Sequence, residues 1–279
     1  MHTNFRRRTL ALATLAAALF AGSGAFAQDK NTLKVGVSVG NGEQIFEVVK
    51  KVAAKDGLNI QVVVFNDYQL PNAALASGDL DANAFQHQPF LDNQNKARGF
   101  DIVPVGLTIT APLGFYSRKI KSIDQLPDGA SVGIQNDPSN GNRALLLLQS
   151  AGLITLKPEA VKNNNATPLD VVTNPKKLKL VALDAAQLPR SLDDTDYSFV
   201  NGNFALASGL KLTEALALEK TGPTYQNVVA VRTADKDAPW VKDIADAYRS
   251  KEFLAVTEKS FPGFVKTDYQ QALQAVASK

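Results

Sequence analysis

Hydrophobic residues in this chain alternate between short β-branched runs and stretches with helical spacing. The runs predict strands at Leu33–Val39, Ile60–Phe65, Ala82–Phe85 and Ile102–Gly106, and the segments between them predict helices over 44–54, 69–77 and 89–98. This alternation is typical of an α/β protein with a mostly parallel sheet. Ligands of such sheets bind in the loops beyond the carboxyl ends of the strands.

A second series of the same kind begins further along the chain. Ser131–Gln135 predicts a strand, Asn136–Gly141 a turn and 142–151 a helix, and Tyr197–Val200 predicts a later strand. We therefore expect two α/β lobes joined by two crossing segments, at Pro112–Ser117 and Asn227–Arg232. The expected first lobe comprises residues 28–112 plus 225–279, and the expected second lobe comprises 113–224.

The N-terminus carries the pattern of a secretory signal peptide. Arg6-Arg7-Arg8 is followed by the apolar run Leu10–Phe20 and by the small-residue sequence Ala25-Phe26-Ala27. We expect residues 1–27 to be removed after Ala27, which places a soluble protein in the periplasm. The chain contains no cysteine, so we also expect it to carry no lipid anchor.

Charge and composition narrow the classes of function. The chain has 30 basic and 27 acidic residues, and three of the basic ones lie in residues 1–27, which contain no acid. The remainder is formally neutral, which argues against nucleic acid or an anionic membrane as the partner. From Gln28 onward the single histidine is His87. Thiolate metal sites, cysteine nucleophiles and histidine clusters are thereby excluded.

One pattern is compatible with an enzyme. Gly36-Val37-Ser38-Val39-Gly40 has the spacing of a hydrolase nucleophile elbow, with His87 as the one candidate base. Only ten residues separate the expected cleavage site from Ser38. No earlier strand is then available to supply an oxyanion donor, so a secreted Ser-His hydrolase is kept as an unfavoured alternative.

Polar and aromatic residues gather beyond the predicted strand ends and suit a small zwitterion. Arg143 offers a planar donor for a carboxylate, and the amide oxygens of Asn201 and Asn203 are suited to accept from an ammonium group. Aromatic side chains supply an apolar wall. The candidate ligand-binding residues are Tyr68, Phe85, His87, Phe90, Asn136, Ser139, Asn140, Arg143, Asn201 and Asn203.

Long motifs in these segments resemble the methionine-binding lipoprotein family, the substrate-binding proteins of methionine ABC importers. They are 67–72 (DYQLPN), 81–87 (DANAFQH), 136–148 (NDPSNGNRALLLL), 185–190 (AAQLPR) and 201–205 (NGNFA). The resemblance implies a two-lobed periplasmic-binding-protein fold, type II-like. It also implies that Arg143 binds the ligand carboxylate and Asn201 its amino group. Many members have a tyrosine where this chain has Phe90, and many have a different loop at Val39–Gln44.

The resemblance further implies a protein without enzymatic activity and without cofactor or metal. It would act as a monomer, bind L-methionine or a close relative, and deliver it to a membrane permease with its ATPase. A different amino acid or a methionine dipeptide remains an alternative ligand.

Overall fold

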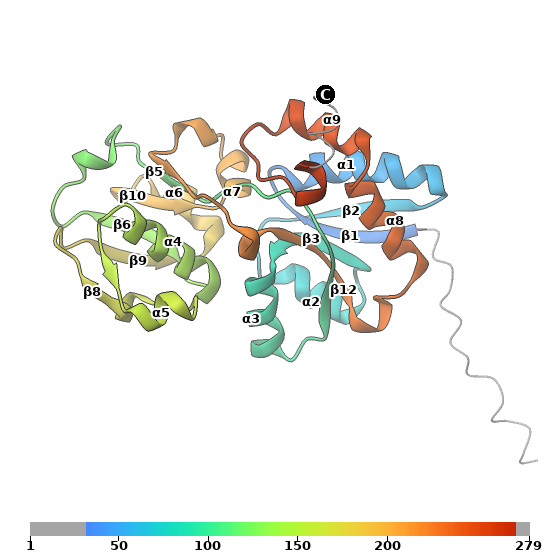
Figure 1. Ribbon diagram of the computed structural model, residues 1–279, viewed down its shortest axis with the longest axis horizontal. Helices are drawn as coiled ribbons and strands as arrows, with labels where there is room; N and C mark the ends of the chain where they lie inside the picture. The colour runs from blue at the N-terminus through green and yellow to red at the C-terminus, as the bar shows by residue number, and fades with distance from the viewer. Residues whose placement is uncertain (1–31, 272–279) are drawn as a thin grey trace, which may run out of the picture. The chain divides into compact units, whose positions relative to one another are not determined.

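The structure is a computed structural model that describes residues 32–271 (Figure 1). The expected signal peptide, residues 1–27, lies outside the described residues. Within the described part of the chain, no helix is long and apolar enough to cross a membrane.

The first sheet has five strands in the order β2-β1-β3-β12-β4. They are β1 (Thr32–Ser38), β2 (Asn59–Phe65), β3 (Ala82–His87), β4 (Ile102–Leu107) and β12 (Asn227–Arg232). β1 pairs in parallel with β2 and β3, whereas β12 is antiparallel to both β3 and β4. The sheet is therefore mixed rather than mostly parallel.

Helices cover both faces of this sheet (Figure 1). They are α1 (Gly42–Ala53), α2 (Leu70–Ser77), α3 (Gln88–Arg98), α8 (Pro239–Tyr248) and α9 (Lys251–Ser260), with short 3₁₀ turns η1 (Ala54–Asp56) and η7 (Thr233–Asp235). One core packs α1, α8 and α9 against β1 through residues such as Phe46, Tyr248 and Phe253. A smaller core around Leu75 and Leu91 packs α2 and α3 against the other face.

The second sheet has the order β11-β5-β10-β6-β9. Its strands are β5 (Gly114–Tyr116), β6 (Ser131–Gln135), β9 (Lys179–Leu183), β10 (Tyr197–Val200) and β11 (Ala217–Leu218), and β7 (Thr155–Leu156) pairs separately with β8 (Val171–Thr173). Its helices are α4 (Pro138–Ser150), α5 (Pro158–Lys162), α6 (Leu188–Ser191) and α7 (Gly202–Ala207). The 3₁₀ turns are η2 (Ile123–Gln125), η3 (Pro168–Asp170), η4 (Ala185–Gln187), η5 (Leu212–Glu214) and η6 (Pro223–Tyr225).

The chain passes between the two sheets twice, through residues 108–113 and 219–226. These crossings run side by side: Asn227 N donates to Thr110 Oγ1 (2.7 Å), and Glu219 N donates to Leu113 O (2.8 Å). The two-lobed α/β fold expected from the sequence is confirmed. The crossing expected at Asn227–Arg232 is wrong, because this segment is the strand β12 between β3 and β4. Val228 to Val231 are all buried, as in a strand covered on both faces. Of the crossing expected at Pro112–Ser117, residues 112 and 113 do belong to a crossing, whereas Gly114–Tyr116 form the strand β5.

Helix α4 begins earlier than its hydrophobic pattern predicts. The side chain of Asp137 accepts a hydrogen bond from Asn140 N (2.9 Å), and Pro138 occupies the first helical position. An aspartate cap followed by proline is a strong helix start. The expected turn at Asn136–Gly141 is therefore mostly helix, and Arg143 lies in the second turn of α4 rather than in the first.

Candidate ligand-binding site

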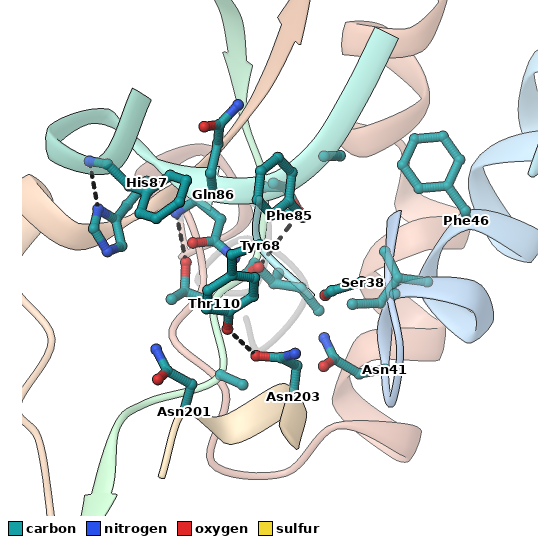
Figure 2. Close-up of a pocket in the computed structure, with 18 of the residues that line it drawn as sticks. Ser38, Asn41, Phe46, Tyr68, Phe85, Gln86, His87, Thr110, Asn201 and Asn203 are labelled. Carbon is teal, nitrogen blue, oxygen red and sulfur yellow. Dashed lines mark hydrogen bonds between the residues drawn. The ribbon is translucent and has the colours of Figure 1, made fainter. Parts of the chain in front are cut away.

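A cavity lies between the strand ends of the first sheet and the starts of α4 and α7 on the second. The space among its lining residues is about 640 Å³, a figure that includes open solvent at its mouth. Eight of the ten residues expected from the sequence line it: Tyr68, Phe85, His87, Phe90, Asn140, Arg143, Asn201 and Asn203. Figure 2 shows several of them converging from β3, α7 and the loop after β2. Their role in binding stays a prediction.

The other two expected residues, Asn136 and Ser139, do not line the cavity. Asn136 Nδ2 donates to Asp184 Oδ1 (2.7 Å), and Ser139 Oγ donates to Asp137 Oδ1 (2.8 Å). Positions 140 and 143 of α4 share a helix face because they are three residues apart. Ser139 is four residues from Arg143 on the same side of α4, but its hydroxyl is used by Asp137, and Asn136 precedes the helix.

The amide oxygen of Asn140 joins both lobes. Asn140 Oδ1 accepts from Arg143 Nη1 (2.9 Å), Asn201 Nδ2 (3.0 Å) and His87 Nε2 (3.2 Å). Its own Nδ2 is held by the Asp137 carboxylate, with the nearer oxygen at 2.9 Å. Asn201 Oδ1 in turn accepts from Gln135 Nε2 (2.8 Å). These amides are therefore held in place by hydrogen bonds within the protein.

His87 is neutral and has both ring nitrogens engaged. Phe90 N donates to its Nδ1 (3.3 Å), which assigns the ring proton to Nε2, the nitrogen that faces Asn140. Burial, with the positive charge of Arg143 as a second cause, lowers the pKa of His87 to about 3. Although Ser38 lines the same cavity, this histidine has no nitrogen left to take its proton. The hydrolase alternative therefore lacks a base.

Three aromatic rings form an apolar wall. The ring centroids of Tyr68, Phe85 and Phe90 lie 5.8–5.9 Å from one another, within the usual range for paired aromatic side chains. Phe204 packs on Tyr68 from the second lobe, with centroids 4.8 Å apart. Burial raises the pKa of Tyr68 well above its ordinary value, so its phenol stays protonated. That phenol donates to Asn203 Oδ1, as the dashed line in Figure 2 shows.

Glu219 was not among the residues expected from the sequence. Arg143 Nε donates to Glu219 Oε1 (2.9 Å), and Arg143 Nη2 donates to Glu219 Oε2 (2.5 Å). The two side chains are 3% and 11% exposed. Glu219 lies 76 positions from Arg143 in a polar stretch, and no local pattern marks it. Glu219 does not line the cavity, but several residues that do were also missed, among them Asn41, Thr108, Thr110, Asn227 and Tyr248. No group of acidic or histidine side chains in residues 32–271 is arranged to hold a metal ion.

Solved structures with the same fold are closely similar to this chain. One is a nutrient-binding protein from Burkholderia cenocepacia bound to methionine, which is 54% identical with a TM-score of 0.81. The similarity covers 84% of this chain and 99% of that protein.

Curated relatives are similar over almost their whole length. The D-methionine-binding lipoprotein MetQ of Salmonella typhi is 46% identical over 93% of this chain and 97% of its own. The protein of the same name from Escherichia coli strain K12 is 48% identical over 87% and 90% respectively. These names contradict the expectation of a protein without a lipid anchor, because both relatives are lipoproteins. That expectation rested on the cysteine count, which addresses only a thioether-linked lipid.

A family model places these similarities in one group. The model described as NlpA lipoprotein matches residues 33–268, which is most of the chain. The match includes both sheets, both crossings and every residue that lines the cavity. This chain belongs to the NlpA lipoprotein family.

Proposed function

We propose that this protein is a periplasmic substrate-binding protein of an ABC importer and that it binds methionine in the cavity between its lobes. The observation that carries the proposal is the pairing, in one buried site, of a guanidinium with a three-ring apolar wall. This combination suits a small amino acid with an apolar side chain. The similar protein from Burkholderia cenocepacia was solved with methionine bound. Membership of the family also sets the hydrolase alternative aside.

The ligand carboxylate binds at Arg143 in this proposal. Three of the N–H groups of Arg143 are used by Glu219 and Asn140. A guanidinium carries five, so two remain for a ligand. The ammonium group binds amide oxygens at Asn201 and Asn203, each of which retains a second lone pair.

The methionine side chain lies against the aromatic wall. A thioether is polarisable and makes favourable contacts with ring edges at about 5 Å. Tyr68, Phe85 and Phe90 present three rings to one space, and His87 borders it. No charged group faces this slot apart from Arg143 among the described lining residues. The slot therefore favours an unbranched apolar chain over a charged one.

The lobes act as two bodies in the proposed cycle. We place the first lobe at residues 28–112 plus 225–279 and the second at 113–224, with 1–27 as an export signal. A ligand that bridges the lobes favours the closed state by its extra affinity for that state. The closed monomer then delivers methionine to a membrane permease and its ATPase.

Thermal unfolding in the presence of ligands tests the proposal. Protein is first unfolded and refolded to remove any bound ligand, and is then heated with L-methionine, D-methionine, methionine dipeptides and other amino acids. One-site binding predicts stabilisation by about 2.7 kcal/mol at a ligand concentration of one hundred times Kd. The expected result is a shift with L-methionine larger than with any other compound. A shift with D-methionine or a dipeptide instead would reassign the ligand, and no shift with any of them would contradict the proposal.

A further inference from the structure

Glu219 is a mostly buried acid directly behind the proposed ligand-binding arginine, with 11% of its side chain exposed. Its carboxylate accepts from Nε and Nη2 of Arg143, from Thr221 Oγ1 (2.9 Å) and from the backbone N–H of Leu113 (3.4 Å). Leu113 belongs to the first crossing, and Glu219 and Thr221 belong to the second. The two crossings therefore hold this carboxylate against the guanidinium.

Glu219 does not face the cavity. It lines a separate groove on the outer side of Arg143, together with Leu146, Leu218 and Tyr225. Arg143 lines both the groove and the cavity, so its guanidinium lies between Glu219 and any ligand. The ring of Tyr225, 4.9 Å from Arg143 Cζ, further restricts the guanidinium. Glu219 is thus a positioning residue, which acts on a ligand only through Arg143.

Both members of the pair are ionised. Burial opposes ionisation of the Glu219 carboxyl, but Arg143 outweighs it, and the pKa of Glu219 is lowered. Arg143 is the only charged residue at neutral pH among the described residues that line the cavity. Asp137, the next carboxylate, is partly exposed and is separated from the guanidinium by Asn140. Glu219 therefore cancels the charge that a ligand would otherwise meet.

We propose that Glu219 determines specificity by neutralising Arg143, so that the cavity selects a zwitterion over the corresponding anion. The inference rests on the proposed function and deepens it. An anion that binds this neutral pair leaves one uncompensated buried negative charge, which is costly. A zwitterion brings no net charge. Without the Glu219 charge the site becomes cationic, and the balance shifts toward the anion.

The test compares two ligands on two proteins. The ligands are L-methionine and methylthiobutanoate, which is methionine without its amino group, and Kd is measured by calorimetry. Glu219→Gln is expected to lower the preference for methionine by at least about tenfold, since a buried charge partner is removed. In absolute terms, methylthiobutanoate should bind this variant more tightly than it binds the wild type. Equal weakening of both ligands would indicate a merely structural role and would overturn the inference.

Two further variants complete the design. Glu159→Gln removes an exposed acid from α5 of the same lobe, and it should leave the ligand preference unchanged. Glu219→Asp keeps the charge and should retain the preference for the zwitterion even if both ligands bind more weakly. The proposed role of the Glu219 charge would be contradicted if Glu159→Gln changed the preference for methionine. It would also be contradicted if Glu219→Asp lost that preference.

A measurement on the wild-type protein does not depend on whether a variant folds. Methylthiobutanoate should bind the wild type far more weakly than methionine, and equal affinity would overturn the inference. A wild type that binds no amino acid contradicts the proposed function itself. A wild type that binds methionine, with an unchanged preference in Glu219→Gln, contradicts only the role of Glu219.

Discussion

The phenol of Tyr68 donates a 2.5 Å hydrogen bond to Oδ1 of Asn203, 135 residues further along the chain. Tyr68 follows a strand of the first sheet, and Asn203 lies in α7 on the second. Asn203 Nδ2 also donates to Val39 O (3.4 Å), so one side chain contacts two loops of the opposite lobe. These contacts exist only when the lobes are close together.

Removing the Tyr68 hydroxyl should weaken binding without loss of the apolar wall. Tyr68→Phe leaves Asn203 Oδ1 without this donor, at a cost of about 0.5–1.5 kcal/mol, which is a two- to tenfold rise in Kd. Calorimetric titration with methionine measures the change. Tyr269→Phe is the matched control, since Tyr269 is exposed, and its affinity should equal that of the wild type. An unchanged Kd for Tyr68→Phe would mean that the bond does not favour the closed state.

Gly40 should be required for close approach of the lobes. Its φ is +100°, and a Cβ at this position would lie 2.2 Å from the backbone oxygen of Asn203. Gly40→Ala should therefore oppose closure and reduce methionine affinity by well over tenfold while the separate lobes remain folded. Gly57→Ala is the control, because Gly57 also has a positive φ (+83°) but nothing lies within 4 Å of its added Cβ. If Gly40→Ala binds methionine as tightly as Gly57→Ala does, the close approach to Asn203 is not required for binding.

The Arg143–Glu219 pair should be coupled in stability. Arg143→Met leaves the mostly buried Glu219 carboxylate without its partner, and it should lower the unfolding free energy by up to about 3 kcal/mol, the lower end for a fully buried pair. Arg143→Met combined with Glu219→Gln removes that charge and should recover much of the loss, although methionine binding stays absent. Urea denaturation of the wild type, both single variants and the double variant measures the coupling. If the losses of unfolding free energy in the two single variants add up to the loss in the double variant, the charges of Arg143 and Glu219 are not coupled.

His87 should make folding stability depend on pH. Its pKa falls from 6.5 in the unfolded chain to about 3 in the folded protein. As the pH falls below 6.5, His87 takes up a proton in the unfolded chain but not in the folded protein. The contribution of His87 to the free energy of unfolding is therefore complete above pH 6.5 and is lost as the pH falls toward 3. At pH 5 the loss is about 2 kcal/mol.

A His87→Asn variant isolates this contribution. Asparagine is a good helix cap, and its Oδ1 takes the place of Nδ1 as acceptor for Phe90 N. Urea unfolding of both proteins at pH 7.5 and pH 5 gives the difference. The wild type should lose more stability than the variant between these two pH values, and equal losses would contradict a buried neutral histidine.

Local patterns in the sequence determine much of this protein. The β-branched runs predict β1, β2 and β3, since buried strands need such side chains and their neighbours fix the turns. The residues at and beyond the strand ends of both sheets predict eight members of the cavity lining, because these ends lie around one cavity. The capping of α4 by Asp137 and Pro138 was also present in the sequence, although its hydrophobic pattern alone did not reveal it.

Only the tertiary structure decided which distant residues meet. β12 enters the first sheet between β3 and β4 after the chain has completed the second sheet, and nothing local distinguishes it from a crossing segment. Glu219 meets Arg143 because the returning crossing passes behind α4, and the sequence contains no periodicity that links the two. Asn136 lies near Arg143 in sequence yet outside the cavity, because it precedes α4 and its amide bonds Asp184 instead. Local composition thus determines elements and turns, whereas charge pairing and the final cavity depend on long-range packing.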